Sequence, residues 1–117
     1  MIEIHPQPDM IEIRVSGTLT GDDYDVLVPQ LESLAEERGP LRLYIQLEDF
    51  RGWKPDALWQ DVKFDVTHQD DMERVAVVGE KKLEDWGIKL SKPFFKADMR
   101  FFPREEADEA REWLRSG

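Results

Sequence analysis

The fold is decided by the stretch Leu41-Arg42-Leu43-Tyr44-Ile45-Gln46-Leu47-Glu48-Asp49-Phe50-Arg51-Gly52-Trp53. Apolar side chains alternate over residues 41–47, which predicts a strand, and a charged turn that contains Gly52 follows it. Pro55 is acceptable in the first turn of a helix, so a helix is predicted over residues 55–69. A strand, a turn and a helix in this order form a βα unit, and such a turn commonly carries the working surface of a protein.

The predicted turn over residues 48–53 carries carboxylates but no nucleophile. Glu48 and Asp49 could act as bases, yet the turn contains no Cys, Ser, Thr or His. Covalent catalysis needs a nucleophile beside a base. His5 and His68 lie far apart in the sequence and belong to no metal-ligand motif. We therefore expect a protein that is not an enzyme, with no cofactor and no metal site.

Strand-like and helix-like periodicities alternate along the rest of the chain. Strands are predicted at residues 2–4, 10–19, 41–47, 74–79 and 99–102. Helices are predicted from Thr20 to Gly39, over residues 55–69, from Leu83 to Pro93, and after Pro103. A Pro-rich turn over residues 6–9 should join the first two strands as an antiparallel hairpin. The fold class expected is α/β, with a mostly parallel sheet, an N-terminal antiparallel hairpin and about four helices, in one domain over residues 1–117.

Several local features sharpen these predictions. Thr20 is a good N-cap with acidic residues in the first turn behind it, and Pro29 should kink that helix or begin a second segment. The continuous apolar run over residues 75–78 indicates a strand buried on both faces. In the last helix the inward positions should be Ala107, Ala110, Trp113 and Leu114.

The composition excludes several classes of function. Sixteen Lys and Arg against 26 Asp and Glu give a formal net charge of -10, which disfavours nucleic-acid binding and general adsorption to anionic membranes. The absence of Cys excludes disulfides, thiol chemistry and Cys-type zinc sites. The first residues alternate between apolar and polar, unlike a signal peptide, and no apolar run approaches the roughly 20 residues of a membrane span. The default expectation is a cytoplasmic protein.

Three predicted strand ends should meet at one rim of the sheet, at residues 17–22, 48–53 and 79–82. Parallel α/β sheets bind ligands outside the carboxyl ends of their strands. Asp49 lies in this rim, and Arg51, Lys81 and Lys82 would supply positive charge there. The alternative is that these cations occupy an ordinary solvated helix face.

The predicted helix over residues 55–69 has a broad apolar arc, because Leu58, Val62 and the apolar residues at 64–66 cannot all share one narrow stripe with Ala57 and Trp59. A cavity lined by aromatics beneath such a helix would suit an acyl chain or similar apolar ligand. The alternative is that these aromatics fill the core. The residues predicted to line the cavity are Trp53, Leu58, Trp59, Val62, Phe64, Trp86, Phe94 and Phe95.

Several spaced motifs together resemble one known family. They are Gly17-x-Leu19-Thr20, Asp49-Phe50-Arg51-Gly52-Trp53, Ala57-Leu58-Trp59-x-Asp61-x-Lys63-Phe64, His68, Arg74-Val75-Ala76-Val77-Val78-Gly79, Trp86, Pro93-Phe94, Arg100-Phe101-Phe102 and Ala110-x-x-Trp113-Leu114. Over nearly its whole length the chain resembles the SpoIIAA-like (STAS/SEC14 domain-containing) family of small bacterial proteins. The resemblance implies a fold related to anti-sigma-factor antagonists and to lipid-carrying CRAL-TRIO domains. Lipophilic-ligand binding or reversible membrane association is the usual conjecture for that family.

One part of the resemblance does not carry over. Anti-sigma-factor antagonists are switched by phosphorylation of a Ser or Thr in the turn after the central strand. The corresponding turn here reads Asp49-Phe50-Arg51-Gly52 and offers no hydroxyl to accept a phosphate. We therefore expect no phosphorylation switch in this turn.

Two functions remain as predictions. The leading one is a noncatalytic binding module that holds a lipophilic small molecule beneath the helix over residues 55–69 and associates reversibly with a membrane surface. The alternative is a regulatory protein-protein interaction module of STAS type without the Ser/Thr switch. A homodimer is plausible through the edge of the N-terminal hairpin or through the aromatic helix. Nucleic acid is not an expected partner.

Overall fold

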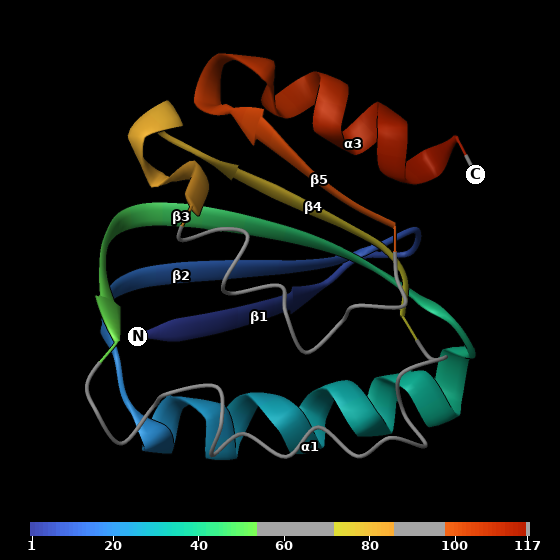
Figure 1. Cartoon of the computed structure of the whole chain (residues 1–117). Helices are drawn as coiled ribbons and strands as arrows, with labels where there is room; N and C mark the ends of the chain where they lie inside the picture. Colours follow the sequence, from blue (N-terminus) through green and yellow to red (C-terminus); the bar gives the residue numbers. More distant parts are fainter. Residues whose placement is uncertain (54–71, 86–97, 117) are drawn as a thin grey trace.

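A five-stranded sheet with a helix on each face organises the chain (Figure 1). The computed structural model describes residues 1–53, 72–85 and 98–116, except the side chains of Tyr24, Trp53 and Met72. The elements are β1 (Ile2–Pro6), β2 (Ile11–Leu19), α1 (Gly21–Arg38), β3 (Leu41–Trp53), β4 (Met72–Gly79), η4 (Lys81–Leu83), β5 (Asp98–Pro103), η6 (Arg104–Glu106) and α3 (Ala107–Arg115).

The strands lie in the sheet in the same order as in the sequence. β1 pairs antiparallel with β2, and β2 to β5 are parallel to their neighbours. One apolar row crosses the entire sheet through the paired residues Ile4, Ile13, Ile45, Val77 and Phe101. The predicted mostly parallel sheet with an antiparallel N-terminal hairpin is therefore confirmed.

Helix α1 begins at the Thr20 N-cap that the sequence predicted, and Thr20 and Asp23 form a capping box there. Thr20 Oγ1 accepts a hydrogen bond from the Asp23 backbone N–H at 3.4 Å, and Asp23 Oδ2 accepts one from the Thr20 N–H at 2.9 Å. Gly39 ends the helix with a positive φ of 81°, and its N–H donates to the Ala35 carbonyl at 2.8 Å. The helix runs unbroken through Pro29, so no second segment begins there.

β3 is longer than predicted. The sequence predicted a strand over residues 41–47 and a turn over 48–53, but the strand continues to Trp53. The reason is that β2 keeps pairing with it, from Ser16 opposite Glu48 to Leu19 opposite Trp53, through two register shifts. Such shifts are β-bulges, which bend a strand without ending its ladder. Figure 1 shows the resulting curl at the end of β3.

The described residues contain two α-helices, α1 and α3, rather than the four or so predicted for the chain. The predicted helix over residues 55–69, and the part of the next beyond Asp85, lie outside the described residues. The last helix begins later than expected, because Pro103 ends β5 and the 3-10 turn η6 comes before α3. Ala110 and Leu114 are fully buried, as predicted. Neither described helix combines the length and apolar composition needed to cross a bilayer.

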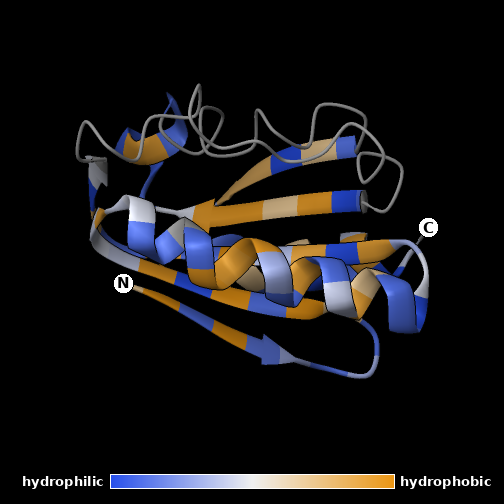
Figure 2. Ribbon diagram, turned by 90° about the horizontal axis from the view of Figure 1, so that it is seen from below, coloured by the Kyte–Doolittle hydropathy of each residue, from blue (hydrophilic) through white to orange (hydrophobic). Residues whose placement is uncertain are grey.

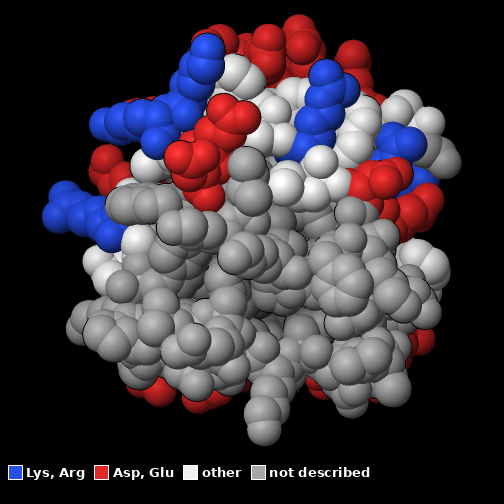
Figure 3. All heavy atoms as spheres, viewed as in Figure 1, with Lys and Arg blue, Asp and Glu red and all other residues white. Residues whose placement is uncertain are grey.

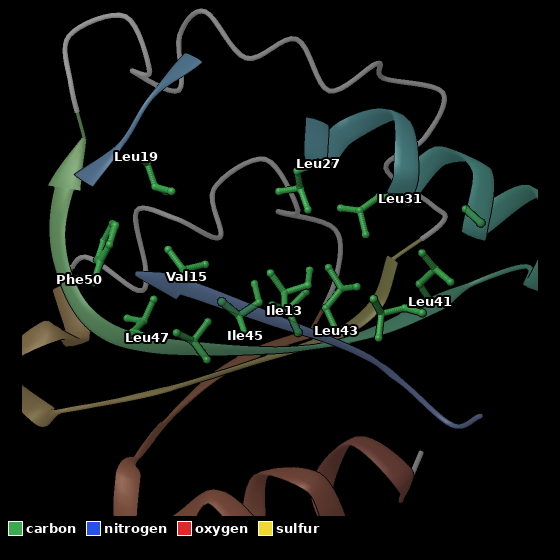
Figure 4. Close-up of a cluster of buried hydrophobic side chains, with 14 residues drawn as sticks. Ile13, Val15, Leu19, Leu27, Leu31, Leu41, Leu43, Ile45, Leu47 and Phe50 are labelled. Atoms are coloured by element: carbon green, nitrogen blue, oxygen red, sulfur yellow. The ribbon is translucent and has the colours of Figure 1, made fainter. Parts of the chain in front are cut away.

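The two faces of the sheet carry separate apolar clusters. Fourteen buried side chains pack on the face that α1 covers (Figure 4). On the opposite face α3 packs against a smaller cluster, whose members are Met10, Tyr44, Ala76, Val78, Phe102, Ala110 and Leu114. Residues 75–78 of β4 are all buried and contribute to both clusters, which confirms the prediction of a strand buried on both faces.

Candidate functional site

The carboxyl end of β3 and the segment after β4 form one rim. A hollow of about 190 Å³ lies between them, lined by Asp49, Phe50, Arg51, Glu80, Lys82 and Leu83. β2 joins the same rim, because Gly17 pairs with Phe50 and Leu19 with Trp53. The parallel sheet thus brings together side chains that are some 30 positions apart in the sequence. We call these six lining residues the rim hollow.

The backbone of β3 shapes the rim hollow. Asp49 has a φ of 48°, in the left-handed region that Asp tolerates better than most side chains. Gly17, opposite the bulge, and Gly52 also have positive φ, of 63° and 95°. The bulge turns the Phe50 side chain into the α1-face core, as Figure 4 shows, where it is 4% exposed. Its neighbours Asp49 and Arg51 consequently point outward and are exposed.

Charges of both signs surround the hollow. The Glu80 carboxylate lies 3.1 Å from Lys82 Nζ and 3.9 Å from Arg104 Nη1. Arg51 and Lys81 form no ion pair with any residue that the structure describes. Figure 3 shows Lys and Arg side chains around the η4 end of the molecule, interspersed with Asp and Glu. The rim is therefore a mixed-charge surface on a chain whose net charge is -10.

The side chains at the rim offer charged and apolar groups to a ligand or partner. Within residues 1–53, 72–85 and 98–116, no group of three His, Cys, Asp or Glu side chains could hold a metal ion. The rim offers charged donors and acceptors around a small hollow with the apolar Leu83 at its side. Such an arrangement can recognise a complementary surface by hydrogen bonds and ion pairs.

The structure describes the predicted rim residues but not most of the residues predicted to line an apolar cavity. Asp49, Arg51 and Lys82 lie together at the rim hollow, and Lys81 belongs to the same η4 segment without lining it. Trp53 ends β3, but its side chain is outside the description. Seven further residues lie outside the described part of the chain, so the apolar cavity remains a prediction; these are Leu58, Trp59, Val62, Phe64, Trp86, Phe94 and Phe95.

Sequence reasoning missed the part played by Phe50. This residue was assigned to a charged turn, whereas it anchors the bend of β3 in the core and so orients its two neighbours. The available signal was a single large apolar side chain between Asp49 and Arg51. Large apolar side chains such as that of Phe are usually buried, which favours an inward position for Phe50 over an exposed one.

Tyr44 lies on the opposite face of β3, under α3. Its side chain is 0% exposed, and its hydroxyl has no hydrogen-bond partner among the described residues. Burial raises the pKa of the Tyr44 phenol, while the nearby Arg111 guanidinium opposes that rise. Arg111 Cζ lies 4.4 Å from the centroid of the Tyr44 ring, a cation–π contact. Tyr44 belongs to the packing of α3 rather than to the rim.

Comparison with known proteins places this fold. No curated protein matches the chain. A crystal structure of an uncharacterized protein from the DUF3478 family with a SpoIIAA-like fold, from Shewanella loihica, is similar to it with a TM-score of 0.73. The two share 27% sequence identity over 97% of this chain and 92% of the other. The model of the SpoIIAA-like family matches residues 10–115, and the chain therefore belongs to the SpoIIAA-like family.

Proposed function

We propose that the chain is a noncatalytic protein-binding module whose partner docks on the rim hollow. The observation that carries this proposal is the bulge at Asp49, which fixes Asp49 and Arg51 outward on a strand that remains paired to Trp53. A non-glycine residue in the left-handed region is uncommon, and such residues concentrate at functional sites. Membership of the SpoIIAA-like family is compatible with a binding role without catalysis.

The rim is built to bind without a large loss of entropy. Strand residues held by a ladder on one side and by Phe50 in the core lose little freedom when a partner binds. Arginine is enriched at protein interfaces, and Arg51 is exposed and has no ion-pair partner within the described residues. Alternating charges favour a protein surface of complementary pattern over a polyanion, which would require a uniformly cationic face.

The lipophilic-ligand prediction finds no equivalent support in the described residues. The rim hollow, at about 190 Å³, is smaller than the roughly 300–1,000 Å³ of typical small-molecule sites, and charged side chains surround it. The residues predicted to line an apolar cavity lie outside the described ranges. Binding of a lipophilic molecule and reversible membrane association therefore stay as predictions, and the protein-binding proposal takes precedence.

Regulation of this proposed binding would not use a phosphate at the bulge. Residues 49–52 and the other residues lining the rim hollow include no Ser, Thr or Tyr, so the hollow itself offers no hydroxyl for phosphorylation. Control would have to come from partner concentration or from another part of the chain.

Site-specific photo-cross-linking tests the proposal. A photoreactive residue at position 51 or 82 should capture the same protein in the native host, whereas one at exposed Glu37 on α1 should not. After identification and purification of that protein, Arg51→Glu should weaken its binding about tenfold, corresponding to about 1.4 kcal/mol. Arg38→Glu makes the same charge change at the opposite end of the sheet and should leave the affinity unchanged. Equal capture from positions 37 and 51, or equal affinity of Arg51→Glu and wild type, would overturn the proposal.

A lipid measurement separates the two functions. Native mass spectrometry of the gently purified protein would reveal any lipid that co-purifies. If lipid is bound and Arg51→Glu affects neither that lipid nor any protein partner, the lipophilic-ligand prediction replaces the present proposal.

A further inference from the structure

Among the described residues, no strand pairs with the outer edge of β1. Met1 and Ser16 exchange two hydrogen bonds, from Met1 N to Ser16 O at 2.7 Å and from Ser16 N to Met1 O at 2.9 Å. Opposite pairs in an antiparallel ladder alternate between bonded and unbonded. The register pairs Glu3 with Arg14 and His5 with Glu12, so these residues continue the bonding to β2. It follows that the N–H and C=O groups of Ile2 and Ile4 point away from the sheet.

The sequence of β1 is self-complementary for pairing with a second copy of itself. In an antiparallel pair centred on Ile4, the two Ile4 residues exchange both backbone hydrogen bonds. Ile2 N–H then donates to the Pro6 carbonyl of the second copy. Glu3 of each chain lies opposite His5 of the other, which gives two pairs of opposite charge when the imidazoles are protonated. Shifting the centre to Glu3 would place two carboxylates opposite each other, so the charges select the Ile4 register.

The geometry within one chain supports this charge pairing. His5 Nε2 lies 3.6 Å from Glu3 Oε2, so both side chains reach the same region on one face of the strand. Both are about half exposed and therefore accessible to a second chain. On the opposite face Ile2 and Ile4 are partly buried against the α1-face core. Figure 2 shows the resulting alternation of hydrophobic and hydrophilic residues along β1.

The side of α1 next to this edge is uncharged. A shallow hollow of about 340 Å³ between β1 and α1 is lined by Pro6, Pro29, Gln30, Ser33 and Leu34. Val26, Pro29, Gln30 and Ser33 follow helical spacing as one exposed stripe, and Val26 is 55% exposed. Other exposed positions of the helix are charged; they include Asp22, Asp25, Glu36, Glu37 and Arg38.

The net charge of the chain favours contact between copies through this uncharged stripe. Two copies of a chain with a net charge of -10 repel each other, and the cost is lowest where neither surface carries charge. The stripe of α1 and the free edge of β1 adjoin, so they form one continuous surface. Pro6 lacks an N–H and limits the paired strand to a short length. A two-fold pair of such strands covers both β1 edges, so no further copy can add at β1.

We propose that β1 is a homodimerisation strand, which pairs antiparallel with β1 of a second copy around Ile4 and brings the two uncharged α1 stripes together. This inference goes beyond the protein-binding function and uses a different surface. The rim hollow lies at the carboxyl ends of the parallel strands, so the dimer leaves it free for a partner.

The oligomeric state as a function of concentration tests the dimer. Sedimentation equilibrium should show a species of twice the 13.8 kDa chain mass. Ile4→Pro removes an N–H that points away from β2, so it spares the hairpin and should weaken dimerisation at least tenfold. His5→Glu should weaken it similarly, because each new carboxylate then lies opposite Glu3.

A charge swap makes the test specific for the register. Glu3→Lys combined with His5→Glu restores opposite charges across the two-fold axis, so the dimer should be at least about threefold tighter than with His5→Glu alone. It should not reach the wild-type affinity, because the same changes place like charges opposite Arg14 and Glu12 of β2 within each chain. Thermal unfolding of each variant checks that the hairpin is intact. A chain that stays monomeric at millimolar concentration overturns the proposal. So does a dimer whose affinity is the same in wild type, Ile4→Pro and His5→Glu, because such a dimer uses another surface.

Discussion

The two faces of the sheet hold their helices by different means. On the α1 face, fourteen buried side chains form one cluster that is entirely apolar. On the α3 face the cluster has half as many members and includes the phenol of Tyr44, and arginines surround it. Arg42 and Arg74 donate hydrogen bonds to the α3 carbonyls of Leu114 and Trp113. One helix is attached mainly by buried area, and the other partly by directional polar contacts.

The arginines on the α3 face compensate for a short helix. α3 spans Ala107–Arg115, and three carbonyls of its last turn accept hydrogen bonds from outside the helix. Ser116 donates to Glu112 and Trp113, Arg74 also donates to Trp113, and Arg42 donates to Leu114. Positive charge at a helix C-terminus also interacts favourably with the helix dipole. Arg74 makes two contacts with α3. Its Nη1 lies 2.6 Å from the Trp113 carbonyl oxygen, and its guanidinium lies 5.0 Å from the Trp113 ring centroid, a cation–π contact. We therefore expect α3 to be the less stable of the two layers.

Truncation of one leucine in each layer should have the largest effect. Leu31 of α1 and Leu114 of α3 are both 0% exposed. Leu31→Ala should cost about 4 kcal/mol and Leu114→Ala about 2 kcal/mol, within the range of about 2–5 kcal/mol for buried Leu→Ala changes. The difference arises because the last turn of a short helix can shift to close a cavity, whereas the middle of α1 cannot. Urea unfolding with matched m-values measures both. Equal costs would show that the two layers are equally rigid.

The sequence predicted the α1 layer better than the α3 layer. Alternating or continuous apolar runs located the described strands, and the Thr20 N-cap with acidic residues behind it located the start of α1, because these are local patterns. The arginine contacts depend on which helix end lies over which strand. They join residues 72 and 39 positions apart, which no local pattern specifies.

The rim could be predicted in part. Parallel topology alone places Asp49, Arg51 and Lys82 at neighbouring strand ends, and the structure brings them to one hollow. The form of the rim could not be foreseen, because Glu48, Asp49 and Gly52 read locally as a turn. Pairing with β2 overrides that local turn preference, and the bulges accommodate the turn residues within the strand.

Removal of one arginine contact should weaken the α3 layer selectively. Arg74→Met deletes the hydrogen bond to the Trp113 carbonyl and the cation–π contact, and should cost about 1–2 kcal/mol. Amide hydrogen exchange should accelerate in α3 and stay unchanged in α1. Arg100→Met is the matched control, because Arg100 lies over the Phe102 ring at 5.0 Å but is exposed, and should cost below about 0.5 kcal/mol. Faster exchange in both helices would mean that the layers unfold together.

Removal of the Tyr44 hydroxyl should have the smallest effect and the opposite sign. That hydroxyl is buried without a hydrogen-bond partner among the described residues, so Tyr44→Phe should stabilise the protein by about 1 kcal/mol at pH 7. The Arg111 contact involves the ring and is retained. Leu43→Val, on the same strand but facing α1, is the control and should instead cost stability.

The pH dependence of the Tyr44→Phe effect provides an independent check. Burial raises the pKa of Tyr44 above its ordinary value of 10.0, so the unfolded chain releases this proton at lower pH than the folded chain. The contribution of Tyr44 is fully present below pH 10.0 and is lost as the pH rises through the folded-state pKa. The advantage of Tyr44→Phe should therefore grow on going from pH 7 to above pH 10. If the variant is instead destabilised at pH 7, the hydroxyl has a partner, and polar contacts hold α3 more extensively than the arginines alone indicate.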